Sequence, residues 1–136
     1  MSKRANSRKL AMRMLYQMGV RDTNLAMVFD DIEKDAYAEE TVNWAYHLAK
    51  VAIDHMVDID AIIKQYSISW DMDRLNQVDK ALLRLGICEI NYTDTPYQVV
   101  LNEMIELSKT YSSEESSKFI NGILGKYVTD TCSQDS

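Results

Sequence analysis

Six basic side chains and no acidic one stand in the first 21 residues of this 136-residue chain. They are Lys3, Arg4, Arg8, Lys9, Arg13 and Arg21. The rest of the chain carries nine Lys and Arg against all 21 Asp and Glu, so a positive end is joined to an acidic body. Concentrated cations can neutralise phosphates or bind an acidic protein, although many charged helix faces are simply solvated. The charge pattern therefore predicts a binding surface but does not separate nucleic acid from protein.

Motifs for catalysis or metal binding are missing from the sequence. It holds no glycine-rich phosphate loop, no His-Glu-x-x-His, no Cys-x-x-Cys and no nucleophile elbow. His47 and His55 lie eight residues apart, without a cysteine or carboxylate at zinc-ligand spacing. We therefore expect no enzymatic activity, no cofactor and no metal.

The binding residues need a helical framework, and residues 78–92 are predicted to form its central helix. Apolar or small side chains cover most of its circumference, and the polar residues Lys80, Arg84 and Asn91 share a stripe about 40° wide. Glu89 lies opposite that stripe, where a lone carboxylate is costly to bury. We predict a donor from another helix beside Glu89, forming a structural salt bridge. Gly86 predicts a second backbone crossing closely.

Helices are also predicted on either side of the central one. Apolar periodicity places them at residues 4–18, 37–57, 61–66, 96–111 and 113–127. Asn76, Thr95 and Ser112 are expected to cap the central helix and the two that follow it. Residues 20–36 are expected to form a loop with a docked apolar patch at 25–29. Trp70 is expected to be a core anchor.

The composition predicts one all-α domain over residues 1–128 and a polar tail over 129–136. Four Gly and one Pro leave little material for hairpins, while good helix formers are plentiful. Cys88 and Cys132 are predicted to be unpaired, which suits a reducing compartment. No apolar run reaches the roughly 18 residues of a membrane span. We therefore expect a cytoplasmic protein.

Blocks of sequence spread along most of the chain, and densest over residues 70–126, carry a family resemblance. They are Leu15-Tyr16, Val78-Asp-Lys-Ala-Leu-Leu-Arg-Leu85, Glu89-Ile90, the stretch from Pro96 to Lys109, and Lys118-Phe-Ile-Asn-Gly-Ile-Leu124. In this order and spacing they resemble the NusB family of bacterial transcription antitermination factors. The resemblance implies an all-α fold of roughly seven helices in two packed three-helix groups.

The same resemblance implies what the protein binds. Family members pair with the ribosomal protein NusE and bind boxA, a single-stranded RNA element of nascent ribosomal RNA transcripts. The complex then joins other Nus factors on RNA polymerase and favours read-through of terminators.

The resemblance also assigns roles to individual positions. Residues expected at the RNA are Lys3, Arg4, Arg8, Lys9, Lys118 and Phe119, with a place in the core as the alternative for Phe119. Tyr16 and Asp79 match positions that face the ribosomal partner. Asn121 and Gly122 are expected to let helices pack closely.

Some positions depart from the family pattern. Residues 5–7 interrupt a run that is often denser in arginine, so RNA affinity of this chain alone is expected to be weak. Few exposed aromatic residues are expected, which predicts that the partner completes the RNA site. The rival interpretation is a protein-only interaction module, such as a homodimer that covers its own basic face.

Overall fold

Seven α-helices and one short 3-10 turn make up the computed structural model, which describes residues 3–32, 34–67 and 75–132. The helices are α1 Lys3–Arg21, α2 Leu25–Asp31, α3 Glu39–Asp54, α4 Met56–Tyr66, α5 Gln77–Tyr92, α6 Tyr97–Tyr111 and α7 Glu114–Cys132, with the turn η1 at Lys34–Ala36. The described residues contain no strand. The predicted all-α class is confirmed. Trp70 lies outside the described residues.

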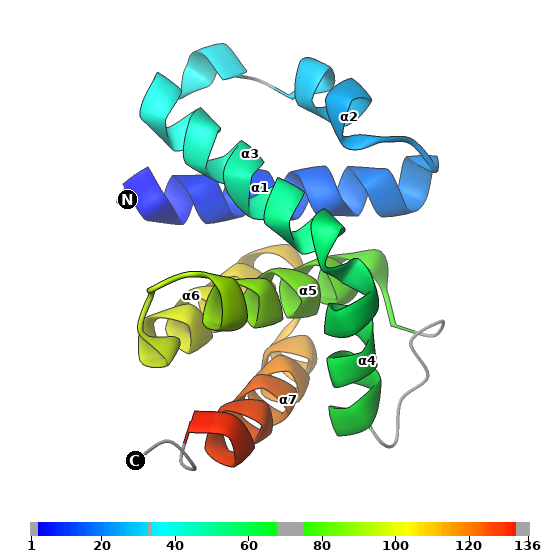
Figure 1. Ribbon diagram of the computed structural model, residues 1–136, viewed down its shortest axis with the longest axis vertical. Helices are drawn as coiled ribbons and strands as arrows, with labels where there is room; N and C mark the ends of the chain where they lie inside the picture. Colours follow the sequence, from blue (N-terminus) through cyan, green and yellow to red (C-terminus); the bar gives the residue numbers. More distant parts are fainter. Residues whose placement is uncertain (1–2, 33, 68–74, 133–136) are drawn as a thin grey trace.

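The helices form two groups that meet at α5. Helices α1, α2 and α3 pack on one another, and α5, α6 and α7 form the second group, with α4 against α5 and α7 (Figure 1). Helix α5 also contacts α1 and α3 of the first group, which confirms its predicted central position. Its start is as predicted, because the Asn76 side chain accepts a hydrogen bond from the Asp79 backbone N–H at 2.8 Å.

The core is apolar and continuous through both groups. Fully buried side chains come from all the long helices, including Leu10, Met14, Leu48, Ile63, Leu82, Leu83, Met104 and Leu124. Figure 1 shows α1 lying across α3, so the first helix has one face in this core and another at the molecular surface. This placement positions the basic side chains.

The expected loop over residues 20–36 is wrong in part. Helix α1 continues through Gly19 to Arg21, and α2 then occupies most of the apolar patch. The Asn24 side chain caps α2 by accepting a hydrogen bond from the Met27 backbone N–H at 2.9 Å. Leu25 and Val28 are buried, so the patch reaches the core as one face of a short helix.

Three other local expectations also need correction. Helix α6 starts at Tyr97 with Pro96 at the cap position, so Thr95 lies one residue too early and the helix has no side-chain cap. Ser113, not Ser112, caps α7 by accepting a hydrogen bond from the Ser116 backbone N–H at 3.0 Å. The helix expected at residues 61–66 begins earlier, at Met56, and only His55 separates it from the end of α3.

Helix α7 continues to Cys132, so the first four residues of the expected polar tail are helical. No helix in the described ranges combines the length and apolar character that crossing a membrane requires.

Candidate nucleic-acid interface

The basic side chains at the start of α1 lie over aromatic rings. The guanidinium carbon of Arg4 is 3.9 Å from the centre of the Trp44 ring system, and Lys9 Nζ is 5.1 Å from the centre of the Tyr37 ring. The next basic residue along the helix, Arg13, is 5.8 Å from the Tyr111 ring centre. Cations over ring faces are attracted by the ring quadrupole. Each ring therefore restrains a long flexible side chain without neutralising its charge.

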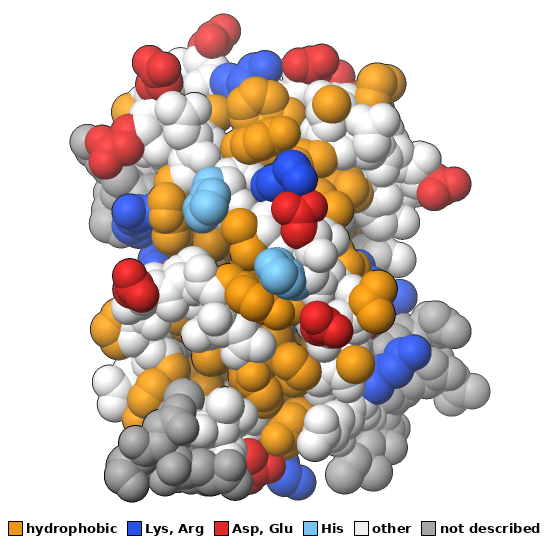
Figure 2. All heavy atoms as spheres, viewed as in Figure 1, with side chains coloured by type: hydrophobic (Ala, Val, Ile, Leu, Met, Phe, Trp, Pro, Cys, Tyr) orange, Lys and Arg blue, Asp and Glu red, His pale blue; other side chains and the backbone are white. Residues whose placement is uncertain are grey.

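These cations remain accessible from solvent. Arg4 and Arg13 are exposed and Lys9 is partly exposed, while the side chain of Lys3 lies outside the described part of the chain. In Figure 2 a group of Lys and Arg side chains lies at the left edge, where Figure 1 places the start of α1. Over the rest of that view acidic and basic side chains are interspersed. The start of α1 therefore gathers basic side chains, next to the acidic first turn of α3.

Arg8 does not belong to this accessible set, contrary to the sequence-based assignment. It is 3% exposed, and its Nε donates to both carboxylate oxygens of Glu89 at 2.9 Å. Its Nη2 donates a further hydrogen bond to the same carboxylate. Glu89 is fully buried, so the donor predicted beside it is confirmed. Arg8 is that donor, and its burial against Glu89 keeps it from contacting RNA at the surface.

A second candidate region lies at the start of α7. Lys118 is exposed and lines a shallow hollow of about 330 Å³ that also includes Lys109 and Asn121. Phe119 is partly buried, packs against the core and lines a separate hollow of about 370 Å³. Phe119 therefore contributes to the core, and its place at the RNA stays a prediction.

Tyr16 lines the side of α1 that faces α2, α5 and α6. It is partly buried and borders a hollow of about 500 Å³ with Arg13, Val78 and Tyr111. Polar groups surround an apolar floor that includes Leu10 and Val28. An apolar side chain of a bound protein would fit such a hollow.

Asp79 lies beside Val78 on α5 and is only 5% exposed. Its Oδ2 accepts a hydrogen bond from the Ser116 hydroxyl at 2.8 Å, whereas its buried Oδ1 has no hydrogen-bond partner among the described residues. It lines the same hollow as Phe119. Native proteins rarely leave a buried carboxylate oxygen without a donor, so Asp79 is a candidate for a role in binding at this hollow.

The aromatic rings under the basic residues were not predicted from the sequence as part of the site. Trp44 and Tyr37 fall within the helix predicted over residues 37–57, and both are only partly buried. Their pairing with Arg4 and Lys9 joins α1 to residues more than 25 positions away, so no local spacing indicates it. In the described part of the chain, no group of three His, Cys, Asp or Glu side chains could hold a metal.

Comparison with known proteins gives a consistent result. The NusB family model matches residues 5–129. The transcription antitermination protein NusB of Alkaliphilus oremlandii is 41% identical over 124 residues, which cover 90% of each chain. The NusB protein of Listeria welshimeri is 42% identical over 132 residues, covering 94% of this chain and 98% of that one.

Solved structures agree in fold. NusB from Aquifex aeolicus superimposes with a TM-score of 0.82 at 30% identity, covering 96% of this chain and 93% of that one. A structure of the antitermination factors NusB and NusE in complex with double-stranded RNA gives a TM-score of 0.84 at 29% identity, covering 91% and 94%. The chain therefore belongs to the NusB family of transcription antitermination proteins, which are not enzymes.

Proposed function

We propose that this protein binds the single-stranded boxA element of nascent ribosomal RNA transcripts together with the ribosomal protein NusE. The pair then joins other Nus factors on RNA polymerase and favours read-through of terminators. Membership of the NusB family supports the antitermination role, and a similar NusB has been solved with NusE and RNA. The observation that carries RNA binding is the acid-free basic start of α1, where Arg4 and Lys9 are held over aromatic rings.

The phosphates of the RNA are the groups that these cations bind. Lys3, Arg4 and Lys9 follow one another along the first two turns of α1, and Lys118 contributes a further charge from α7. Neutralising phosphates releases condensed counterions, so the affinity falls as the salt concentration rises. The acidic remainder of the protein repels RNA and confines it to these regions.

The protein partner binds at the hollows beside Tyr16 and Asp79. The first hollow accepts an apolar side chain of the partner, and the second, which Asp79 lines, accepts a polar group of the partner. Val78 and Asp79 are consecutive in α5 and line one hollow each, so one partner surface spans both. The partner also supplies RNA contacts that this chain lacks.

Capture of the partner followed by RNA binding tests the proposal. Immobilised Arg4→Glu/Lys9→Glu protein should retain NusE and lose boxA RNA, because both reversed charges lie at the surface. Lys64→Glu is the matched control, since Lys64 is exposed on α4, and it should retain both. Arg8 is left intact, because reversing it would place two carboxylates together in the core. Full RNA retention by the double variant would contradict the proposal.

The rival interpretation, a protein-only module or homodimer, predicts a different outcome. Light scattering after gel filtration would show a dimer of this chain whose mass does not change when RNA and NusE are added. The proposal predicts a complex of this chain, NusE and RNA instead.

A further inference from the structure

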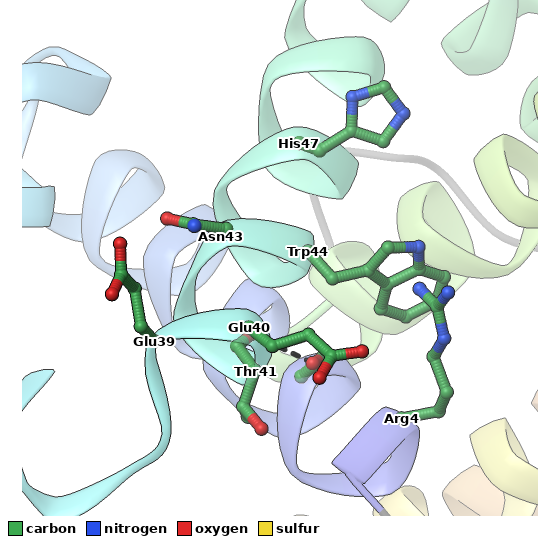
Figure 3. A pocket seen from close by; sticks show the side chains of 8 residues that line it. Arg4, Glu39, Glu40, Thr41, Asn43, Trp44 and His47 are labelled. Atoms are coloured by element: carbon green, nitrogen blue, oxygen red, sulfur yellow. Dashed lines mark hydrogen bonds between the residues drawn. The ribbon is translucent and has the colours of Figure 1, made fainter.

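A hollow of about 550 Å³ lies between the start of α1 and the first turns of α3. Figure 3 shows its lining, in which the Arg4 side chain extends from α1 toward the Trp44 ring system on α3. Asn43 and His47 are exposed on the same helix and also border it. Its volume is within the roughly 300–1,000 Å³ typical of small-molecule sites.

We propose that Trp44, with the Arg4 guanidinium seated on it, is a stacking platform for one unpaired nucleobase. This inference rests on the proposed RNA binding and adds a base-binding site to it. Unpaired bases stack on aromatic rings and on arginine planes in single-stranded RNA recognition. The Arg4 guanidinium carbon is 3.9 Å from the centre of the indole, which is contact distance. Arg4 is exposed, so a base can reach the stack.

The platform is held in place from beneath. The buried Ser7 hydroxyl donates to the Thr41 carbonyl oxygen at 2.7 Å, which ties the first turns of α1 to α3. The Arg8 guanidinium carbon lies 5.4 Å from the Trp44 ring centre, and Arg8 is itself fixed by Glu89. The ring and Arg4 are therefore brought together by the packing of two helices, which lowers the ordering cost when a ligand binds.

The charges around the hollow favour a base over a phosphate. Glu39 and Glu40 belong to the first turn of α3 and line the same hollow as Arg4. Their carboxylates repel a phosphate group but impose no such cost on an uncharged base. Lys9 lies one to two turns further along α1, over the Tyr37 ring, and does not line this hollow. The phosphates therefore contact Lys9 and the edge of the exposed Arg4 guanidinium, while one base stacks on the face of that guanidinium over Trp44.

The experiment compares normal boxA RNA with RNAs that lack the base at one position, using this protein paired with NusE. One of these RNAs should lack the base that stacks on the platform, and its affinity for the unaltered protein should be about 10-fold lower than that of normal RNA. The Trp44→Leu protein should lose about the same factor with normal RNA, which is a typical value for a stacked base. Because both changes remove the same stack, combining them should add little. Trp44→Phe keeps a ring and should recover most of the affinity, and Tyr97→Leu, an exposed aromatic on α6, should have no effect.

Tryptophan fluorescence supplies an independent measurement. In a Trp70→Phe background Trp44 is the only tryptophan, because the chain has two. Normal RNA should quench its emission, and the RNA lacking the stacked base should not. The platform would be overturned if Trp44→Leu lowered the affinity for every RNA by the same factor, or if RNA left the Trp44 emission unchanged. Salt-sensitive RNA binding through α1 would still stand in either case. No RNA binding by the unaltered pair would overturn both proposals.

Discussion

The Arg8 and Glu89 side chains form an ion pair inside the protein, where neither has another charged partner in the described residues. Removing one partner leaves an uncompensated buried charge. Arg8→Ala or Glu89→Ala should therefore lower the free energy of unfolding by about 3–5 kcal/mol, measured by urea denaturation. Replacing both residues with apolar ones of similar size should restore much of this loss.

The matched control for that prediction is Lys50→Ala. Lys50 forms an exposed i,i+4 pair with Asp54 on α3, and exposed pairs contribute little because water screens them. Its urea midpoint should stay close to that of the unaltered protein. Equal sensitivity of the two pairs would mean that the buried one does not hold the helices together.

Arg8 also shows the limit of residue-level prediction. Its neighbours in a basic run suggested a shared surface role, yet Arg8 lies three and seven positions before the buried Ala11 and Leu15. These spacings place all three on one face of α1. The helical period thus contained a signal that Arg8 points inward. Glu89 was correctly predicted to need a donor, but a single sequence does not indicate which of 15 cations supplies it.

The Cys88 thiol should be unreactive in the folded protein. Burial, with a smaller contribution from the Glu89 charge, raises the pKa of Cys88 from 9.0 to about 12. The folded state thus favours the neutral Cys88 thiol over the thiolate. The stability that this buried thiol contributes is present below pH 9.0 and is lost as the pH rises toward about 12. In a Cys132→Ser background, a thiol reagent at pH 8 should label Cys88 only as fast as the protein opens. Immediate labelling would contradict this burial.

At the scale of the helices, two glycines should respond oppositely to replacement by alanine. A Cβ added at Gly86 would lie 2.8 Å from Leu124 Cδ1 and 3.3 Å from Met104 Cγ, both in the core. A Cβ at Gly122 would meet nothing within 4 Å. Gly86→Ala should lower the free energy of unfolding by up to about 2 kcal/mol, because overpacking of the core outweighs the gain in helix propensity. Gly122→Ala should stabilise by about 0.5–1 kcal/mol.

Thermal or urea unfolding of the two variants measures whether the first loses stability and the second gains it. Stabilisation by Gly86→Ala would mean that α5 and its neighbours can separate without cost.

The expectation that a backbone crosses at Gly86 is corrected, since side chains of α6 and α7 make the contact. The expected packing role of Gly122 is also corrected, because it is exposed and open.

The helices were predicted well where they are long and apolar on one side. Helix α5 occurs within one residue of its expected start and ends at its expected end. Helix α2 was missed because seven residues are too few to show a period clearly, although Asn24 supplied a cap signal. The cap predicted at Thr95 is wrong because α6 starts one residue later than expected, which places Pro96 at the cap position.

For the whole molecule, the sequence predicted that basic and acidic residues are separated along the chain. It did not predict which side chains the basic residues contact in the fold. The acid-free first 21 residues indicated a positive end. The aromatic rings that hold those cations come from α3, α6 and the residue after η1, and only folding brings them to α1. Pairings across such separations leave no local pattern in a single sequence. The sequence-based expectation was of few exposed aromatic residues, and Trp44 and Tyr37, which lie beside these cations, are only partly exposed.

The most direct test of the central claim is the salt dependence of RNA affinity, measured by anisotropy with a single-stranded boxA RNA. With NusE present, contacts from Lys3, Arg4, Lys9 and Lys118 should give a slope of log K against log salt of about −3 or steeper, at about −0.7 per phosphate. Without NusE the same RNA should bind much more weakly. Binding that is unaffected by salt and independent of NusE would contradict the account.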